Sequence, residues 1–127
     1  MISLTVVIII LFLHFLSDFV FQTDWQAQNK SKLNKALIEH TATYSAVWFI
    51  PMVVIFLTHS LDLDLAILKA LSFVGITFIF HTTQDYFTSR LNSRLWEQKK
   101  VHNFFVSIGL DQFGHYAQLL LTYYLLK

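Results

Sequence analysis

Four apolar stretches separated by short polar segments constrain this sequence more than any other feature. They cover residues 2–22, 36–58, 65–88 and 103–126. Each is close to the roughly 20 residues that an α-helix needs to cross the hydrocarbon core of a bilayer. Pro51 lies inside the second stretch, where a membrane helix tolerates proline as a kink. The pattern predicts an all-α fold: an integral membrane four-helix bundle, with residues 1–127 forming a single transmembrane domain.

The composition excludes most classes of soluble protein. Hydrophobic residues make up 55% of the chain, charged residues make up 13%, and the mean hydropathy is +0.53. A soluble domain of this size could not cover so much apolar surface with so few charges. The net charge of +1 is too small for nucleic-acid binding by bulk electrostatics, so no nucleic-acid partner is expected. The absence of cysteine excludes disulfides, thiolate metal sites and cysteine nucleophiles.

The charges of the connecting segments predict the orientation in the membrane. Segment 23–35 contains three Lys and one Asp, and segment 89–102 contains two Arg, two Lys and one Glu. The turn between them, residues 59–64, contains two Asp and neither Lys nor Arg. Because positively charged loops stay in the cytoplasm, we expect both basic segments inside and both termini outside. The short connections make neighbouring helices antiparallel, as in a compact bundle.

Histidine and aspartate recur at a spacing of four residues inside three of the predicted spans. The pairs are His14 with Asp18, His81 with Asp85, and Asp111 with His115. Chance gives roughly 0.6 such pairs for this composition. The spacing places both members of a pair on one face of a helix. His40 adds a histidine in the second span. Because ionisable side chains are costly inside a membrane, each of these residues is a functional candidate.

The depths of these residues in the bilayer also coincide. With a rise of about 1.5 Å per residue, all of them except His115 lie roughly 6–14 Å from the cytoplasmic boundary. His115 lies at about 18 Å, a little past the midplane of a core about 30 Å thick. We therefore expect polar groups from all four helices to meet between the cytoplasmic boundary and the centre of the bilayer.

Imidazole and carboxylate groups on facing helices are the usual way in which a bundle holds a metal ion. These ligands suit zinc, manganese, iron or nickel, and we expect a divalent ion, zinc or manganese. The histidines and aspartates exceed the four ligands of tetrahedral zinc. Either two metal ions share carboxylates, or one metal ion is surrounded by aspartates that orient its histidine ligands. The candidate ligands are His14, Asp18, His40, His81, Asp85, Asp111 and His115.

The function expected from such a site is metal-assisted hydrolysis. The metal ion would polarise a carbonyl or phosphoryl oxygen and lower the pKa of a bound water. A carboxylate that is not bound to metal would act as general base, which makes Asp18, Asp85 and Asp111 the candidate catalytic residues. A site that opens near the inner interface of the lipid bilayer suggests a lipid or lipid-linked substrate.

Two other classes of function stay open at this point. Chains of histidine and carboxylate also transfer protons, which would make the protein a proton or divalent-cation transporter or channel subunit, acting as a small homo-oligomer. The same side chains can simply form hydrogen bonds between helices in a non-catalytic membrane interaction protein. A transport pathway would continue through the outer half of the bilayer, where the sequence has few polar residues.

The polar residues of the spans also fall into longer motifs. The first is His14-Phe-Leu-Ser-Asp18-Phe-Val-Phe-Gln22-Thr-Asp-Trp, followed by Lys30-Ser-Lys and then His40. The others are His81-Thr-Thr-Gln-Asp85-Tyr-Phe and Asp111-Gln112-Phe-Gly-His115. In order and spacing these motifs resemble a family of small bacterial and phage membrane proteins, domain of unknown function 3307, over nearly the full chain.

The resemblance implies a multi-pass protein of the bacterial inner (plasma) membrane. The family has no established activity, so the resemblance implies none for this chain. A looser likeness connects the motifs with small inner-membrane proteins labelled metal-dependent hydrolases, which also contain intramembrane His and Asp motifs. That likeness is an analogy between sites and does not assign a function.

Overall fold

The computed structural model describes residues 2–127, which are helical almost throughout and include no β-strand. The elements are α1 (Leu4–Phe15), the π-helical turn η1 (Leu16–Val20), α2 (Asp24–Asn29), α3 (Asn34–Val47), α4 (Phe49–Ser60), α5 (Leu63–Glu97) and α6 (Val101–Leu126). The prediction of an all-α fold is confirmed. The prediction of four helices is too low by one, because the short helix α2 joins the four long helical units α1–η1, α3–α4, α5 and α6.

Helix α2 forms inside segment 23–35, which its polar composition marks as a loop. The backbone N–H of Gln26 donates to the Thr23 hydroxyl (3.2 Å), and the backbone N–H of Thr23 donates to the Gln26 side chain (3.0 Å). This reciprocal capping box satisfies two N–H groups that otherwise have no partner at a helix start. The helix reverses the chain so that Lys30, at its end, faces the bundle.

The connection between α5 and α6 is much shorter than the predicted segment 89–102. Helix α5 continues to Glu97, α6 begins at Val101, and Lys99 turns the chain with a left-handed φ of 56°. The segment after the apolar stretch includes good helix formers such as Arg, Leu and Glu, so the change in composition does not end the helix. The basic side chains Arg90 and Arg94 therefore project from a helix and not from a loop.

A break at Trp48 separates α3 from α4, and Pro51 explains its position. Proline has no N–H to donate to the carbonyl of Val47, and its ring clashes with that carbonyl. The N–H of Trp48 instead donates to the carbonyl of Ser45, only three residues back, at 3.2 Å. The kink that the sequence predicts for the second span thus lies one turn before the proline.

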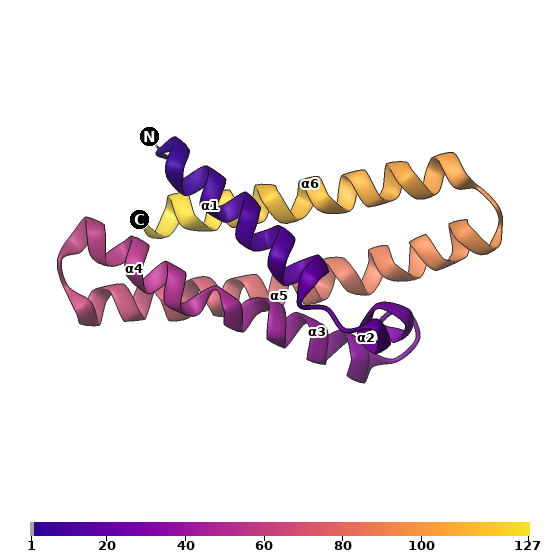
Figure 1. Cartoon of the computed structure of the whole chain (residues 1–127), viewed down its shortest axis with the longest axis horizontal. Helices are drawn as coiled ribbons and strands as arrows, with labels where there is room; N and C mark the ends of the chain where they lie inside the picture. Colours follow the sequence, from indigo (N-terminus) through magenta and orange to yellow (C-terminus); the bar gives the residue numbers. More distant parts are fainter. Residues whose placement is uncertain (1) are drawn as a thin grey trace.

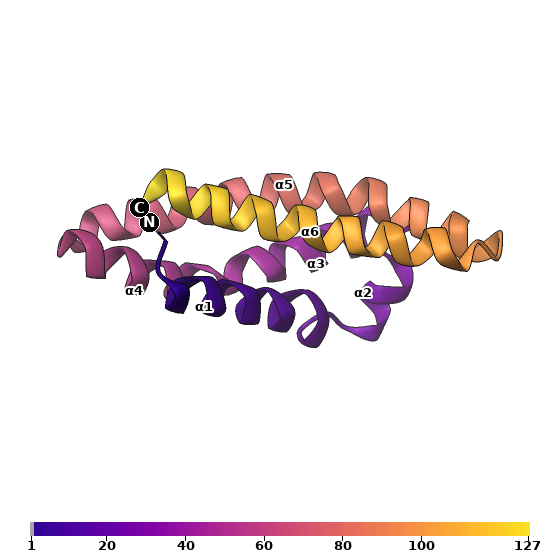
Figure 2. The same cartoon turned by 90° about the horizontal axis from the view of Figure 1, so that it is seen from above.

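The long helices form two layers. Figure 2 shows α5 and α6 in one layer and α1 with α3 and α4 in the other, and both chain ends lie at the same end of the molecule (Figure 1). The apolar core fills the space between the layers towards that end, with Ile10, Trp48, Phe73 and Leu119 fully buried. On α5, the core residue Phe73 precedes His81 and Asp85. These two polar residues therefore lie farther from the end of the molecule that holds the apolar core.

Two helical units among the described residues are long and apolar enough to cross a membrane, residues 34–60 and residues 63–97. The unit Leu4–Val20 is a shorter apolar helix. Large apolar side chains also cover the outside of the bundle; the exposed ones include Leu4, Ile8, Phe12, Ile50, Val54, Leu68, Ile79, Leu110, Phe113 and Leu125. Single exposed apolar residues are normal in soluble proteins, but a surface covered by them marks contact with lipid or protein.

Candidate metal centre

A buried polar cluster lies where η1, α3, α5 and α6 meet. The structure brings together all seven residues that the sequence nominates: His14, Asp18, His40, His81, Asp85, Asp111 and His115. The first five and His115 are at most 4% exposed, and the side chain of Asp111 is 12% exposed. We define these seven residues as the polar cluster. Its burial means that each charge must find its partner within the protein.

Asp18 reaches the polar cluster from a π-helical turn. The N–H of Phe21 donates to the carbonyl of Leu16, five residues back, at 2.9 Å. Asp18 Oδ2 lies 3.7 Å from His14 Nε2, whereas Asp18 Oδ1 lies only 3.1 Å from His40 Nε2 on α3. The turn therefore directs the carboxylate across the bundle as well as towards its neighbour on the same helix. Single π-helical turns inside α-helices are frequent at functional sites.

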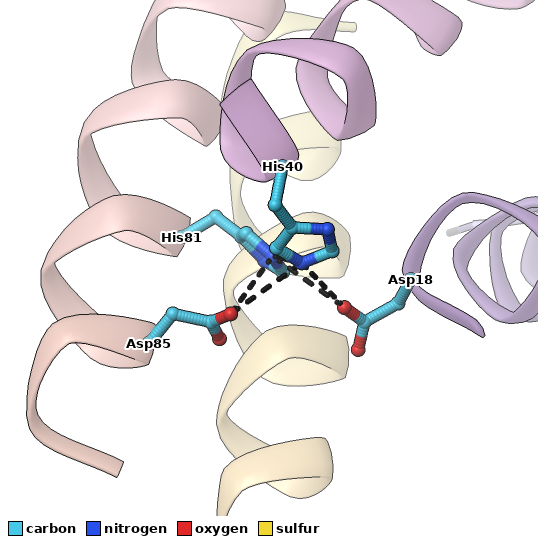
Figure 3. A group of neighbouring side chains, drawn as sticks. All are labelled: Asp18, His40, His81 and Asp85. Atoms are coloured by element: carbon cyan, nitrogen blue, oxygen red, sulfur yellow. Dashed lines mark hydrogen bonds and ion pairs between the residues drawn. The ribbon is translucent and has the colours of Figure 1, made fainter. Parts of the chain in front are cut away.

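Four side-chain atoms, from Asp18, His40, His81 and Asp85, lie within 4.8 Å of one another (Figure 3), and we call them the tetrahedral group. His40 Nε2 lies 3.1 Å from Asp18 Oδ1, 3.4 Å from Asp85 Oδ2 and 3.3 Å from His81 Nε2. His81 Nε2 lies 3.6 Å from Asp18 Oδ1 and 3.7 Å from Asp85 Oδ2. Zinc bonds of about 2.1 Å place the ligand atoms of a tetrahedral site about 3.4 Å apart. Five of the six distances within the group are thus close to this spacing, and the sixth, between the two carboxylate oxygens, is at most 4.8 Å.

Asp85 belongs to a second group as well, with His115 and Asp111 on α6. His115 Nε2 lies 3.2 Å from Asp85 Oδ1 and 3.4 Å from Asp111 Oδ1. One oxygen of Asp85 faces the tetrahedral group, and the other faces α6. Asp85 therefore connects the two groups, which is the position of a carboxylate that either bridges two metal ions or orients a neighbouring ligand.

A contact between two histidines favours the second of these roles. His81 Nδ1 and His115 Nδ1 lie 3.1 Å apart, so one of them carries the proton. With the proton on His81, its Nε2 lone pair is free for a metal ion, and His115 donates from Nε2 to Asp85 or Asp111. A metal-bound imidazole usually donates its other N–H to a carboxylate, carbonyl or water, and here His115 takes that place and is itself held by the two carboxylates. The ring of Tyr44 stacks on His81 at 3.7 Å between centroids and fixes its plane.

His14 lies beside the two groups and belongs to neither of them. Its Nδ1 lies 2.7 Å from the Tyr44 hydroxyl, which donates to it, and its Nε2 donates to Gln112 Oε1 at 2.8 Å. The Gln112 amide in turn donates to Asp18 Oδ2 at 3.2 Å. The geometry thus gives His14 a place behind Asp18, where it orients the carboxylate through Gln112.

The structure adds one charged residue that sequence reasoning assigned only to the topology. Lys30 Nζ lies 2.9 Å from Asp85 Oδ2 and 3.5 Å from His40 Nε2, and the lysine side chain is 19% exposed. Burial by itself lowers the pKa of Lys30, but the carboxylates of Asp85 and Asp18 outweigh it, so the pKa is raised. Lys30 is therefore a fixed positive charge at the edge of the tetrahedral group.

The chain matches the model of one protein family over residues 6–127, which includes every residue of the polar cluster. The family is described as Protein of unknown function (DUF3307). This chain belongs to that family. The membership confirms the resemblance seen in the motifs. No curated protein and no solved structure matches the chain. The function must therefore be inferred from the site itself.

Close packing of α5 against α6 holds the third aspartate of the polar cluster. The Gln84 amide donates to Asp111 Oδ1 at 3.0 Å and also to the Asp111 carbonyl. Gly114 makes this approach possible, because a Cβ at that position would lie 2.7 Å from Gln84 Oε1. Glycine is needed here for space and not for an unusual backbone angle. Gly114 lies within the motif Asp111-Gln112-Phe-Gly-His115, but the motif alone does not show that its Cα must remain free of a side chain.

Proposed function

We propose that this DUF3307 protein is a multi-pass membrane protein that binds a divalent metal ion and uses it to hydrolyse a lipid or lipid-linked substrate. The observation that carries the proposal is the tetrahedral group of Asp18, His40, His81 and Asp85. Its atoms come from three separate elements, η1, α3 and α5, and all four residues are buried. Hydrogen bonds between helices require only that side chains meet in pairs. A metal ion requires that several ligand atoms approach one common point, as the atoms of these four residues do.

The surface of the bundle supports a membrane location. Exposed apolar side chains occur on α1, α4, α5 and α6, and two units have the length and composition of membrane spans. The acidic residues Asp62 and Asp64 lie at the α4–α5 turn, whereas Lys99 and Lys100 lie at the opposite α5–α6 turn. With the basic turn in the cytoplasm of a bacterial cell, all four long units cross the inner membrane and the polar cluster lies towards the cytoplasmic side.

The charges of the polar cluster favour a cation. Three aspartates lie within the cluster, and Lys30 supplies one fixed positive charge next to Asp85. Carboxylates in a buried site repel one another unless they are protonated or neutralised by a cation. A divalent ion supplies the missing charge directly. Two imidazoles and two carboxylates in tetrahedral arrangement suit zinc best, and manganese is the alternative for oxygen-rich coordination.

Asp85 is the ligand most easily exchanged for water. Catalytic zinc keeps three protein ligands and one open position, and Asp18, His40 and His81 supply such a set. Asp85 has other partners, since Lys30 holds Oδ2 and His115 holds Oδ1. A metal ion held by these residues would activate a water as a Lewis acid, and Asp85 would be placed to accept the water proton as general base. Hydrolysis would then break the bond between the carbonyl or phosphoryl group and its leaving group, which would take up the proton from Asp85, while Asp111 would orient the base through His115.

Proton or cation transport is the second candidate, because the hydrogen bonds of the polar cluster connect all of its helices. His14 and Tyr44 form the end of this network towards the chain termini. Beyond Tyr44 lies the apolar core, including the fully buried Trp48 and Phe73, which pack at 5.6 Å between ring centroids. A pathway across the membrane would have to pass through this core. The network therefore fits a site that is reached from one side better than it fits a channel.

Metal analysis of the detergent-purified protein tests the proposal. We expect stoichiometric zinc or manganese, and a melting temperature that falls with a chelator and recovers when the ion is added. His81→Ala and Asp85→Asn should abolish this response. His102→Ala is the matched control, because His102 is exposed near the start of α6. Protein without metal whose melting ignores both chelator and cations would contradict the proposal.

A further inference from the structure

We propose that a cavity between α2, α5 and α6 binds the headgroup of an anionic phospholipid, with the phosphate on Lys30 and Lys32 and the acyl chains towards Phe104, Phe105 and Ile108. The proposal rests on the function proposed above and names the class of substrate. The cavity has a volume of about 810 Å³. This volume is within the range of about 300–1,000 Å³ for small-molecule sites.

One wall of the cavity is polar and has unused hydrogen-bonding capacity. The wall contains Lys30 and Lys32 from the end of α2, and Ser89 and Asn92 from α5. Ser89 Oγ and Asn92 Oδ1 are inaccessible to solvent, yet neither has a hydrogen-bond partner among the described residues. Buried polar atoms without partners are rare and call for an explanation. Rotation of these side chains towards the cavity would bring both atoms to a ligand that accepts and donates hydrogen bonds.

The opposite wall is apolar and aromatic. Phe104, Phe105 and Ile108 of α6 line it together with Trp96 of α5, and the rings of Trp96 and Phe104 lie 5.0 Å apart. Trp96 and Phe105 are 59% and 63% exposed. Aromatic residues of this kind gather at the level of lipid headgroups, where one side of a ring is wet and the other apolar. The ligand is therefore an amphiphile.

The charges select an anionic headgroup. Lys30 and Lys32 line the cavity against a single acidic residue, Glu97. The nearby turn adds the basic residues Lys99 and Lys100, which attract anionic lipid at a membrane surface. A phosphate accepts from the ammonium groups and from the Ser89 hydroxyl, but Asn92 Oδ1 needs a donor. Phosphatidylglycerol has both features, a phosphodiester and free hydroxyls, whereas phosphatidylcholine has no hydrogen-bond donor in its headgroup.

Lys30 joins this cavity to the polar cluster. Its side chain lines the cavity, and its ammonium group touches Asp85 Oδ2. A phosphate bound to Lys30 would thus lie beside Asp85 Oδ2, the oxygen that would also bind the metal ion. Binding of the headgroup also gives Lys30 a second anion, which weakens its hold on Asp85. The cavity and the proposed metal site are in this way parts of one site.

Native mass spectrometry of the detergent-purified protein in the presence of chelator measures lipid binding without metal or turnover. We expect phosphatidylglycerol to bind more tightly than phosphatidylcholine of the same acyl chains. Lys32→Ala and Asn92→Ala should each weaken phosphatidylglycerol binding about tenfold, the usual loss for a charge-assisted or buried hydrogen bond. Lys35→Ala is the matched control, since the Lys35 side chain is 78% exposed and does not line the cavity.

Two results would overturn the inference: equal binding of the two lipids, or phosphatidylglycerol binding that neither variant changes. Inorganic phosphate is added as a competitor, and displacement of the lipid by millimolar phosphate would show a free-anion site instead. Metal content is measured on the same variants. Normal metal content with unselective lipid binding rejects the cavity alone, whereas selective lipid binding in protein that never holds metal rejects the metal centre alone.

Discussion

Lys30 and Asp85 form an ion pair of 2.9 Å across 55 residues of sequence. The pair ties the connection after α2 to the middle of α5 and closes one side of the polar cluster. It also gives the buried carboxylates a positive charge before any metal ion binds. A metal ion bound to the tetrahedral group would therefore compete with Lys30 for the same atom, Asp85 Oδ2.

Lys30→Met removes the charge and keeps the length of the side chain. We expect the metal-free protein to lose about 3 kcal/mol of unfolding free energy, because a buried carboxylate is left without its partner. Zinc should recover more stability in this variant than in the parent protein, since the ion no longer competes with an ammonium group. Denaturation in detergent, with and without zinc, measures both effects.

Lys35→Met is the control for this prediction. Lys35 Nζ lies 3.8 Å from Glu39 on the exposed face of α3, and such surface pairs contribute at most about 1 kcal/mol. Similar losses in the two variants, or an identical response to zinc, would show that Lys30 is only one of several surface lysines.

Gly114→Ala should disturb Asp111 without unfolding the bundle. The new Cβ would occupy space that the Gln84 side chain now fills, so Gln84 must move and its hydrogen bond to Asp111 is lost. Loss of such an orienting partner typically weakens metal binding by about tenfold or more. Isothermal titration of zinc measures the change, and Gln84→Ala in the Gly114→Ala background should add little further loss.

Gly109→Ala on the same helix provides a matched comparison. No atom lies within 4 Å of a Cβ at Gly109, so the added methyl group meets open space. Alanine is a better helix former than glycine by up to about 1 kcal/mol, and this variant should be at least as stable as the parent protein. If the two alanine variants bind zinc equally well, the space at Gly114 has no role in the site.

The membership of the polar cluster could be predicted from the sequence because burying an ionisable group in a membrane helix is costly. His81 and Asp85 stand out for that reason, and their common face on α5 follows from helical geometry alone. The close approach of the four ligand atoms could not be predicted, because it depends on how η1 and α3 cross α5. A π-helical turn such as the one at Asp18 also has no local sequence signature.

Lys30 shows why the rest of the site escaped prediction. Its role depends on the reversal of the chain by α2, and α2 in turn depends on the capping pair of Thr23 and Gln26. That pair has the spacing of a capping box, Thr-x-x-Gln, but in a short polar segment its composition favours a loop. Charge counting assigns Lys30 to the membrane topology, whereas its contact with Asp85 is a property of the folded chain.

The orientation in the membrane can be tested at the two turns of the bundle. Gln98→Cys places a thiol at the α5–α6 turn, and Asp64→Cys places one at the start of α5, next to the acidic turn; both positions are exposed. In intact cells an impermeant maleimide should label the Asp64→Cys variant and leave the Gln98→Cys variant unlabelled until the cells are lysed. The reverse labelling pattern would show that the protein has the opposite orientation, with the polar cluster in the outer half of the membrane.

Metal binding should weaken as the pH falls. His40 and His81 can bind a metal ion only as neutral imidazoles, so a proton on either ring competes with the ion. Each histidine ligand then releases one proton when the ion binds. The apparent Kd for zinc should therefore rise as pH decreases, by up to about tenfold per pH unit for each histidine ligand that has become protonated.

Calorimetric titration in buffers of different ionisation enthalpy counts the released protons directly. His40→Ala should bind zinc more weakly and release fewer protons, whereas His102→Ala should match the parent protein in both respects. At a zinc concentration of a hundred times Kd, the ion adds about 2.7 kcal/mol of stability, which should disappear on acidification together with the binding. A zinc affinity that stays constant between about pH 7.5 and about pH 5 would contradict coordination by His40 and His81.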